Sequence, residues 1–484
     1  MPFEHGIYTN KAAALMPATN VSTRGIQVVI GTAPVNLLSN PAAAVNTPLL
    51  LAGISDVYSK LGYSDDLASY TIMQAVHASL EVFDVAPIVA INVLSPSTHT
   101  TAKTSDGAMV DGAYTLLEKS VLLASLVVKN STESETFVLG EDYTAAFNPD
   151  GTVTIRRIAD GGISTDTTSI KTTYNILDPT KVTASDIVAG VAYVNRVFQA
   201  LDYVPEIIIA PGYSHTASVG AALIAAASQI STVFKATAIV DIECTTAYTR
   251  ALAIAAKTTN SYNSRNAIVC YPKVKTILGK TVWMSAQLAA LLQFTDSQYD
   301  SSPFVSPSNK SFKILGAYLG DGTTEVLYTL EEANQLNAEG IFTALKFQGW
   351  RGWGNHTGFY SYTAESSGTV YDPSDSFINV KRAFDWQANG FITRYWNKID
   401  SRFNYRAIQT LITDENQFYN AFIAAGLVAG MKLVYDQKAN PDSDVMKGIL
   451  KFKQSLAPYL PIQVLENTLQ FDASLLETAL GGES

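Results

Sequence analysis

The residues that could do chemistry are spread thinly along the chain. The segment from Gly212 to His215 (GYSH) follows an apolar strand pattern, which is where α/β enzymes place their ligands. A nucleophile elbow needs the pattern Gly-x-Ser-x-Gly, however, and the last of these positions is Thr216. Adjacent Ser and His side chains also rarely point at each other. We therefore interpret this segment as a loop and helix N-cap and not as a catalytic serine.

The histidines, cysteines and acidic pairs lack the spacing that a metal site or an acid–base pair needs. Cys244 and Cys270 are far apart with no CxxC, which disfavours zinc and excludes a disulfide scaffold, so we expect two small buried residues in a reducing compartment. Glu331-Glu332 and Asp414-Glu415 fit exposed helix ends. No HxH or HExxH pair joins the five histidines, which are His5, His77, His99, His215 and His356.

Nucleotide-binding patterns are missing from the sequence. No GxxxxGK[ST] occurs, so a P-loop ATPase is not expected. The glycine cluster from Gly349 to Gly358 (GWRGWGNHTG) does not stand between a buried strand and a helix, as a dinucleotide fingerprint must. Its two Trp residues suggest packing. The sequence predicts no catalytic residue, no metal site and no cofactor.

The composition indicates a large globular protein that does not coat nucleic acid. The chain has 484 residues, of which 47% are hydrophobic and 16% charged, enough apolar residues to build several cores. The charged fraction is below the ~25% typical of soluble domains. Either much of the surface is buried against partner subunits, or the loops are rich in uncharged polar residues. A net charge of −10 disfavours general nucleic-acid binding.

The charge is distributed unevenly. Residues 381–453 hold 11 Lys and Arg against 7 Asp and Glu, a net of +4, so the rest of the chain carries −14. This basic region indicates either an acidic partner or local ion pairing on helix surfaces. The N-terminus (MPFEHG) has no basic and apolar signal regions, and the longest apolar runs, such as 421–431, are too short to span a bilayer. We expect synthesis in the cytoplasm and no membrane insertion.

Apolar runs and helical periodicities alternate along much of the chain in the order of a parallel α/β sheet. The predicted strands are 25–34, 88–94, 206–212, 236–242 and 266–271, and the predicted helices are 54–61, 69–84, 186–201, 216–229, 247–258 and 283–294.

Residues 97–187 have a different texture, rich in Thr, Ser, Asp and Gly, with 7 basic and 12 acidic residues. Short strands are predicted at 121–128, 136–139, 152–158 and 169–174, and the sequence from Asn148 to Gly151 (NPDG) predicts a turn. We expect a small all-β sandwich or barrel inserted into the α/β domain.

The C-terminal part is predicted to hold two long helices within 376–428. Strands follow at 431–435, 449–456 and 462–471, and a short helix ends at Leu480. Residues 1–25 have too few apolar positions to fold alone, so they are either a floppy terminus or an arm that docks on another surface. The last twenty residues again indicate an arm, with alternating apolar residues at Val464, Leu469 and Phe471, followed by Leu475, Leu476 and Leu480.

Ordered sequence matches make this chain resemble the contractile tail sheath proteins of myophages and of phage-tail-like bacteriocins. The opening (HGI at 5–7 and VSTRGIQVVIGTAP at 21–34) and the strand ending IAPG at 209–212 are similar to that family. The most specific set is RGWGN at 351–355, YDP at 371–373, KR at 381–382, FDW at 384–386, YW at 395–396, AAG at 424–426 and NP at 440–441. The 97–187 insert matches no fixed family pattern.

The resemblance implies a multi-domain tail-sheath fold of the mixed α/β class. Its expected parts are an N-terminal assembly arm (1–25), a discontinuous α/β sheath domain (26–96 and 188–348), an inserted β-sandwich-like outer domain (97–187), a C-terminal α+β core domain facing an inner tube (349–464) and a C-terminal assembly arm (465–484).

The resemblance also implies a structural function. Subunits polymerise helically, in stacked six-fold rings, around an inner tube, and their arms add strands to the C-terminal domains of neighbouring copies. Release of a metastable lattice contracts the sheath without a nucleotide and drives the tube through a target cell envelope. The implied partners are the inner tube protein and the baseplate and tail terminator proteins, with no direct nucleic acid binding. Assembly occurs in the bacterial host cytoplasm, before release as a virion tail or an extracellular tail-like particle.

The resemblance directs attention to two sets of residues. The expected inter-subunit arm residues are Ile7, Tyr8, Val21, Thr23, Leu469, Phe471, Leu475 and Leu476. The expected inner-tube-facing residues are Lys432, Lys447, Lys451 and Lys453. Two other functions stay open: an α/β enzyme acting on a sugar or nucleotide at the Gly212 loop, and a glycan-binding surface on the insert, which could coexist with the sheath.

Overall fold

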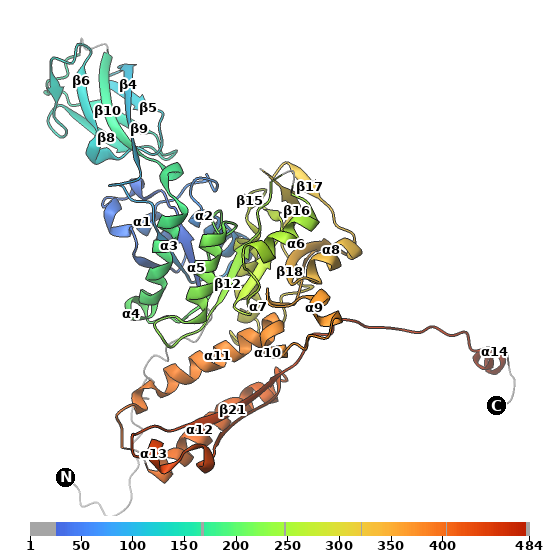
Figure 1. Cartoon of the computed structure of the whole chain (residues 1–484). Coiled ribbons are helices and arrows are strands. Elements are labelled where there is room, and N and C mark those ends of the chain that lie inside the picture. Colours follow the sequence, from blue (N-terminus) through green and yellow to red (C-terminus); the bar gives the residue numbers. More distant parts are fainter. Residues whose placement is uncertain (1–25, 166–168, 246–247, 321, 403, 481–484) are drawn as a thin grey trace, which may run out of the picture.

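The computed structural model describes residues 26–165, 169–245, 248–320, 322–402 and 404–480. Figure 1 shows a small β-module at one end, a central α/β body, a helical module with a β-hairpin beside it, and a terminal segment that leaves the body sideways. This combination of helices with several separate sheets confirms the mixed α/β fold class that the sequence predicts.

The central body is built on an eight-stranded sheet with the order β19-β18-β13-β12-β11-β1-β3-β2. Neighbours from β18 to β3 are parallel, and the two edge strands are antiparallel. The central strands are apolar without alternation because other elements cover both faces of the sheet. The strands are β1 (Ile26–Gly31), β2 (Pro48–Leu51), β3 (Ile88–Asn92), β11 (Pro205–Ile209), β12 (Thr237–Asp241), β13 (Ala267–Cys270), β18 (Ile341–Lys346) and β19 (Trp350–Trp353).

The helices of this body follow the predicted order, with shifted boundaries. The predicted helix 186–201 begins earlier, because Thr183 and Asp186 form a capping box, and a 3-10 turn at Ala192–Arg196 divides it into two helices. The helices are α1 (Ile54–Lys60), α2 (Ile72–Val76, continued by a π-helix at His77–Phe83), α3 (Ala184–Val191), α4 (Val197–Leu201), α5 (Ala217–Ser228), α6 (Arg250–Thr259), α7 (Met284–Ser297) and α8 (Leu330–Asn337).

A second, four-stranded sheet of the body was not predicted. Strands β14 (KVKT) and β17 (TEV) carry charged residues and β15 is only two residues long, so these three lack the apolar run that marks the central strands, whereas β16 (ILGAYL) has one. They are β14 (Lys273–Thr276), β15 (Thr281–Val282), β16 (Ile314–Leu319) and β17 (Thr324–Val326), in the order β15-β14-β16-β17.

The glycine cluster at 349–358 forms β19 and packs against the main core. Trp350 and Trp353 are partly buried there. A Cβ atom on Gly352 would lie 2.7 Å from the Phe342 ring, so glycine leaves the room that this buried ring occupies. This strand lies in the range assigned to the C-terminal domain, but it pairs with β18 in the main sheet.

The insert contains two sheets over a hydrophobic core of its own, with the orders β4-β10-β6-β7 and β5-β9-β8. The prediction of a strand at 121–128 is wrong in part, because Leu123–Ser125 is a 3-10 turn and the strand starts at Val127. Three strands were missed. Polar residues dominate β4, whereas β5 (AYTL) and β8 (YTAAF) are short and mix aromatic residues with Ala and Thr. The strands are β4 (Thr100–Ala108), β5 (Ala113–Leu116), β6 (Val127–Asn130), β7 (Thr136–Phe137), β8 (Tyr143–Phe147), β9 (Val153–Arg157) and β10 (Ser169–Leu177).

The C-terminal module consists of two long helices and a β-hairpin around a third core. Both predicted helices and the first two predicted strands are present. The elements are α9 (Tyr362–Ser366), α10 (Pro373–Ser376), α11 (Ile378–Tyr395), α12 (Tyr405–Ala424), β20 (Val428–Tyr435), α13 (Asp442–Val445), β21 (Phe452–Pro458) and α14 (Ala473–Ala479).

The prediction of a last strand at 462–471 is wrong for the single chain. This segment has no regular secondary structure, and it runs away from the body to α14 (Figure 1). Its sequence alternates as a strand does, but a strand needs a hydrogen-bonding neighbour, which the described part of the chain does not supply.

Helix α11 joins the C-terminal module to the α/β body through buried polar contacts. Arg382 makes a bidentate ion pair with Asp296 of α7, with N–O distances of 3.1 and 2.5 Å. Lys381 Nζ donates to the carbonyl of Ala236 at 2.6 Å. Asn389 exchanges two hydrogen bonds with the backbone of Lys235. These contacts hold the module on the body at a defined angle.

Candidate assembly interface

The hairpin of β20 and β21 is a two-stranded sheet with one covered face. Its inner face carries Met431 and Leu433, which pack on the core beneath α11 and α12, together with partly buried Phe452 and Leu456. Within the residues that the structure describes, neither strand has a second strand beside it. On the outer edge of β20 the N–H and C=O of Leu433 bond the side chain of Asn416 of α12. The rest of the two outer edges has no strand partner in the described chain and forms a template for another strand.

The outer face of this hairpin is exposed and basic. Lys432 lies opposite Ser455, and Lys453 lies opposite Val434, so the two lysines are diagonal neighbours on the same face. Both lysines are exposed.

The segment after β21 exposes the apolar residues that the strand prediction depends on. Leu469 is 89% exposed and Phe471 is 81% exposed. Ile462, Val464, Leu465, Leu475, Leu476 and Leu480 are exposed as well. Soluble proteins rarely leave so many large apolar side chains without a partner, which marks the segment as an interaction element. We call residues 465–480 the C-terminal arm.

The C-terminal arm has two different side-chain faces if it is extended. Leu465, Leu469 and Phe471 fall on one side, and Glu466, Thr468 and Gln470 fall on the other. Residues 454–484 contain four acidic residues and no Lys or Arg, so their net charge is −4. An acidic, half-apolar strand complements the basic hairpin with its apolar inner face.

The structure separates the other predicted residues. Ile7, Tyr8, Val21 and Thr23 lie outside the described residues. Lys451 makes an ion pair with Asp444 at 2.6 Å, and Lys447 is exposed in the turn after α13. The lysines predicted to face an inner tube thus fall into two groups, and only Lys432 and Lys453 share a face.

Sequence patterns missed a further exposed surface at the turn between α11 and α12. Trp396 was predicted to lie on the first long helix, but it starts a 3-10 turn (Trp396–Lys398) and is exposed. Ile399 and Tyr405 are exposed beside it in sequence, together with Lys398, Arg402 and Arg406. Helical periodicity could not separate these aromatic residues from core residues, although the basic residues between them are a visible signal.

The Gly212 loop holds its serine and histidine side chains in contacts with the α/β body. Ser214 is fully buried, and its hydroxyl donates to Asp241 at 2.8 Å. His215 stacks on Trp283, with ring centres 4.8 Å apart and planes inclined by 1°. The serine hydroxyl is thus engaged by Asp241 and shielded from solvent.

Asp241 gives the stability of the body a measurable pH dependence. Burial raises its pKa from 3.8 to about 6, against the hydrogen bonds from Ser285 and Ser214. A carboxyl group with a raised folded-state pKa binds more protons in the folded state, so the free energy of unfolding falls as pH rises from about 4 to about 6.

We expect Asp241→Asn to remove a fall of roughly 3 kcal/mol over this interval, because one pKa unit corresponds to ~1.4 kcal/mol. Guanidinium unfolding of the variant and the parent protein at several pH values measures the difference. Parallel pH profiles for the two proteins would contradict the expectation.

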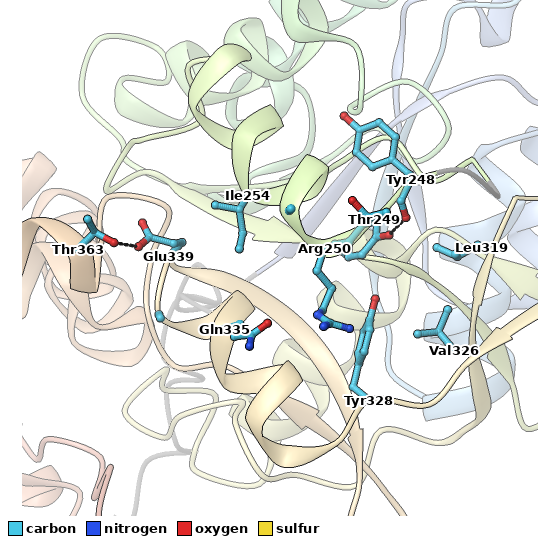
Figure 2. A pocket seen from close by; sticks show the side chains of 13 residues that line it. Tyr248, Thr249, Arg250, Ile254, Leu319, Val326, Tyr328, Gln335, Glu339 and Thr363 are labelled. Atoms are coloured by element: carbon cyan, nitrogen blue, oxygen red, sulfur yellow. Dashed lines mark hydrogen bonds between the residues drawn. The ribbon is translucent and has the colours of Figure 1, made fainter.

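A surface groove of about 800 Å³ lies between α6, α8 and the β16–β17 strands. Figure 2 shows Tyr248 and Tyr328 on its walls, with Arg250 extended beside Tyr328. Arg250 makes an ion pair with Glu332 at 2.7 Å, and Glu339 accepts a hydrogen bond from Thr363 at 2.7 Å. The charged groups here are held by neighbours, so the groove offers no pair poised for acid–base chemistry.

Cys244 and Cys270 are buried free thiols, as predicted. Across the described ranges, no three His, Cys, Asp or Glu side chains gather as a metal site would require. None of the helices in those ranges is both long and apolar enough to cross a bilayer.

No protein-family model matches the chain. The sequence is 28% identical over 509 aligned residues to the tail sheath protein of Burkholderia phage BcepMu, covering 99% of this chain and 98% of that protein. Two solved structures share the fold. One is the sheath complex of PVC, an extracellular contractile injection system, in its contracted state (TM-score 0.55, 13% identity, 98% and 99% coverage). The other is a sheath tail protein from Desulfitobacterium hafniense (TM-score 0.53, 12% identity, 89% and 94% coverage).

The resemblance to contractile tail sheath proteins that the sequence indicates is therefore confirmed over nearly the whole chain. The fold is that of a tail sheath protein.

Proposed function

We propose that this protein is the structural subunit of a contractile tail sheath, which polymerises helically around an inner tube and has no enzymatic activity. The observation that carries the proposal is the coexistence, in one chain, of a two-stranded sheet with open edges and an arm with strand alternation that has no strand neighbour. Each element supplies what the other lacks, so copies of the chain complete each other.

Electron microscopy of the purified protein under negative stain tests this function. A sheath subunit at high concentration forms hollow tubes, whereas an enzyme gives discrete particles. A monomer that stays monodisperse at every concentration and turns over a substrate would overturn the proposal.

The strand alternation of the arm defines how it would sit on the hairpin of another copy. The apolar face of the arm, with Leu469 and Phe471, would continue the inner face of the hairpin over the helical core. The polar face of the arm would then lie on the outer face of the hairpin, because successive side chains of a strand point to opposite sides of a sheet. Glu466 would therefore lie on the face that carries Lys432 and Lys453.

A charge exchange between Glu466 and these lysines tests the arrangement. We expect Lys453→Glu or Lys432→Glu to raise the concentration needed for tube formation about threefold to tenfold, because a cross-strand ion pair becomes a repulsion. Adding Glu466→Lys restores assembly for the lysine that is next to the arm, and sedimentation measures the assembled fraction.

The control variant for this exchange is Lys447→Glu. Lys447 is exposed but lies off the hairpin, after α13, so its reversal is not rescued by Glu466→Lys. If Glu466→Lys rescues neither hairpin lysine, the arm does not lie on this face. Loss of assembly on reversal of Lys432 or Lys453 would then indicate that these lysines contact the inner tube, because a change in the arm cannot restore tube binding.

The remaining parts of the proposal follow the family resemblance. The C-terminal module faces an inner tube, and the insert projects away from it, as its place at the far end of the molecule suggests (Figure 1). Contraction is a transition between two lattices that needs no nucleotide, and baseplate and tail terminator proteins bound the sheath. Assembly takes place in the host cytoplasm, before release in a phage tail or a tail-like particle.

A further inference from the structure

The residues that link β21 to the C-terminal arm form part of the wall of a groove on the chain's own α/β body, and Ile462, Gln463 and Val464 are exposed there. Pro461, Ile462, Gln463 and Val464 line this groove of about 440 Å³ together with Trp353, His356, Tyr360 and Tyr362. The link therefore crosses from the C-terminal module to a different part of the molecule before the arm begins.

Two buried side chains contact this link near its two ends. Asn379 of α11 donates from Nδ2 to the carbonyl of Tyr459 at 3.3 Å. His356 Nε2 lies 2.7 Å from the Gln463 side-chain nitrogen. Both Asn379 of the C-terminal module and His356 of the loop after β19 are buried, so these contacts come from fixed side chains.

The surroundings of His356 set the direction of its hydrogen bonds. Its Nδ1 lies 3.2 Å from the carbonyl of Ser376, which can only accept, so Nδ1 carries the proton and Nε2 accepts from the Gln463 amide. The ring is stacked between Tyr360, with centres 3.7 Å apart, and Phe377, at 4.7 Å. Burial lowers the pKa of His356 to about 4, so the ring is neutral and the acceptor is available near neutral pH.

The arm could in principle pair with its own hairpin. A chain that leaves β21 at Pro458 needs only a short loop to return antiparallel, and residues 459–464 are long enough for one. In that register Thr468 would lie opposite Ser455, and the apolar face of the arm would again cover the core. The alternation of the arm therefore fits its own hairpin as well as that of another copy.

We propose that His356 and Asn379 form a clamp that holds Tyr459 to Gln463 along the body, so that the arm cannot fold back on its own β21 and is presented to a second copy. The proposal rests on the arm exchange proposed above and adds what selects the acceptor. Figure 1 agrees with it, since the chain passes α9 and then leads away from the hairpin.

A cross-link that reports which copy receives the arm tests the clamp. Ser455→Cys and Thr468→Cys are introduced together, and isotopically heavy and light subunits are mixed before assembly and oxidation. The native cysteines are buried, so the new pair reacts selectively. Mass spectrometry then separates mixed heavy–light cross-links, which join two copies, from cross-links within one isotope.

In the exchanged arrangement, an arm that runs parallel to β21 of a second copy with Glu466 beside Lys453 also places Thr468 beside Ser455. With the clamp intact, we therefore expect heavy–light cross-links at the level of random mixing. Gln463→Ala removes the side chain that His356 holds, and we expect within-chain cross-links to rise about fivefold to tenfold, the factor that one lost hydrogen bond corresponds to. His356→Phe, which keeps the ring stacking but lacks the acceptor, should act in the same direction. Gln470→Ala is the matched control, because it removes the same side chain from an exposed arm position.

The outcomes separate the two proposals. Heavy–light cross-links that stay equally abundant in Gln463→Ala and Gln470→Ala would overturn the clamp and leave the arm exchange standing. Within-chain cross-links that dominate in the protein with an intact clamp would overturn the arm exchange itself.

Discussion

Deletion of residues 465–484 is expected to leave a folded monomer that no longer forms tubes. The deleted residues belong to none of the three hydrophobic cores, and their large apolar side chains are exposed, so the body loses no packing. We expect the free energy of unfolding to change by less than about 0.5 kcal/mol, as for other surface changes. Assembly is lost because the hairpin of each neighbour receives no strand.

Two measurements check this expectation together. Denaturant unfolding reports the stability of the truncated monomer, and negative-stain microscopy with sedimentation reports assembly. Tubes built by the truncated protein would show that the arm is not the connecting element. Deletion of residues 1–22 is expected to have the same effect on assembly.

Point variants in the full-length chain provide a matched control for the truncation. Leu469→Asp and Phe471→Asp place a charge on the apolar face of the arm, where it would be buried against the core of a neighbour. Thr468→Asp and Gln470→Asp place the same charge on the polar face of the arm. We expect the first pair to abolish tubes and the second pair to retain them, since burial of an unpaired charge is costly.

The second large effect is expected at the ion pair of Arg382 and Asp296. Both side chains are almost completely buried, and they join α11 to α7. Arg382→Met removes the positive charge and leaves a carboxylate without its bidentate partner. We expect this to lower the free energy of unfolding by about 3–5 kcal/mol, the usual cost of breaking a buried pair from one side.

The exposed ion pair of Arg265 and Asp375 is the control for this variant. Its N–O distance is 2.8 Å and its arginine is 55% exposed, so solvent screens it. Arg265→Met should cost less than about 1 kcal/mol. Guanidinium unfolding of both variants makes the comparison, and equal losses would show that Arg382 does not anchor α11. Replacement of both partners, in Arg382→Met with Asp296→Leu, should recover part of the loss.

The α/β body was predictable from the chain because its signals are local. Central strands such as Ile26–Gly31 and Pro205–Ile209 are apolar runs in a parallel sheet, and the helices between them carry their own periodicity. Strands β2, β18 and β19 of the main sheet, the small sheet of β14 to β17, and strands β4, β5 and β8 of the insert were missed. They depend on cross-strand neighbours that are distant in sequence, such as Lys273 and Tyr318.

The candidate interface was predictable only in part. Alternation at 465–471 predicted both an interaction arm and a formed strand; the arm stays a prediction, and the described single chain has no strand there. The basic character of residues 381–453 was visible, yet the pairing of Lys451 with Asp444 and the exposure of Trp396 were not. The contact of Gln463 with His356 spans 107 positions and has no local signal.

By itself, the sequence determined which segments carry apolar surface and how that surface alternates, because these properties depend on residues that are neighbours along the chain. The tertiary structure alone decided which of those surfaces find a partner within the same molecule. Burial and strand pairing depend on distances between remote segments, so only the folded chain separates the satisfied core from the arm and the open hairpin edges.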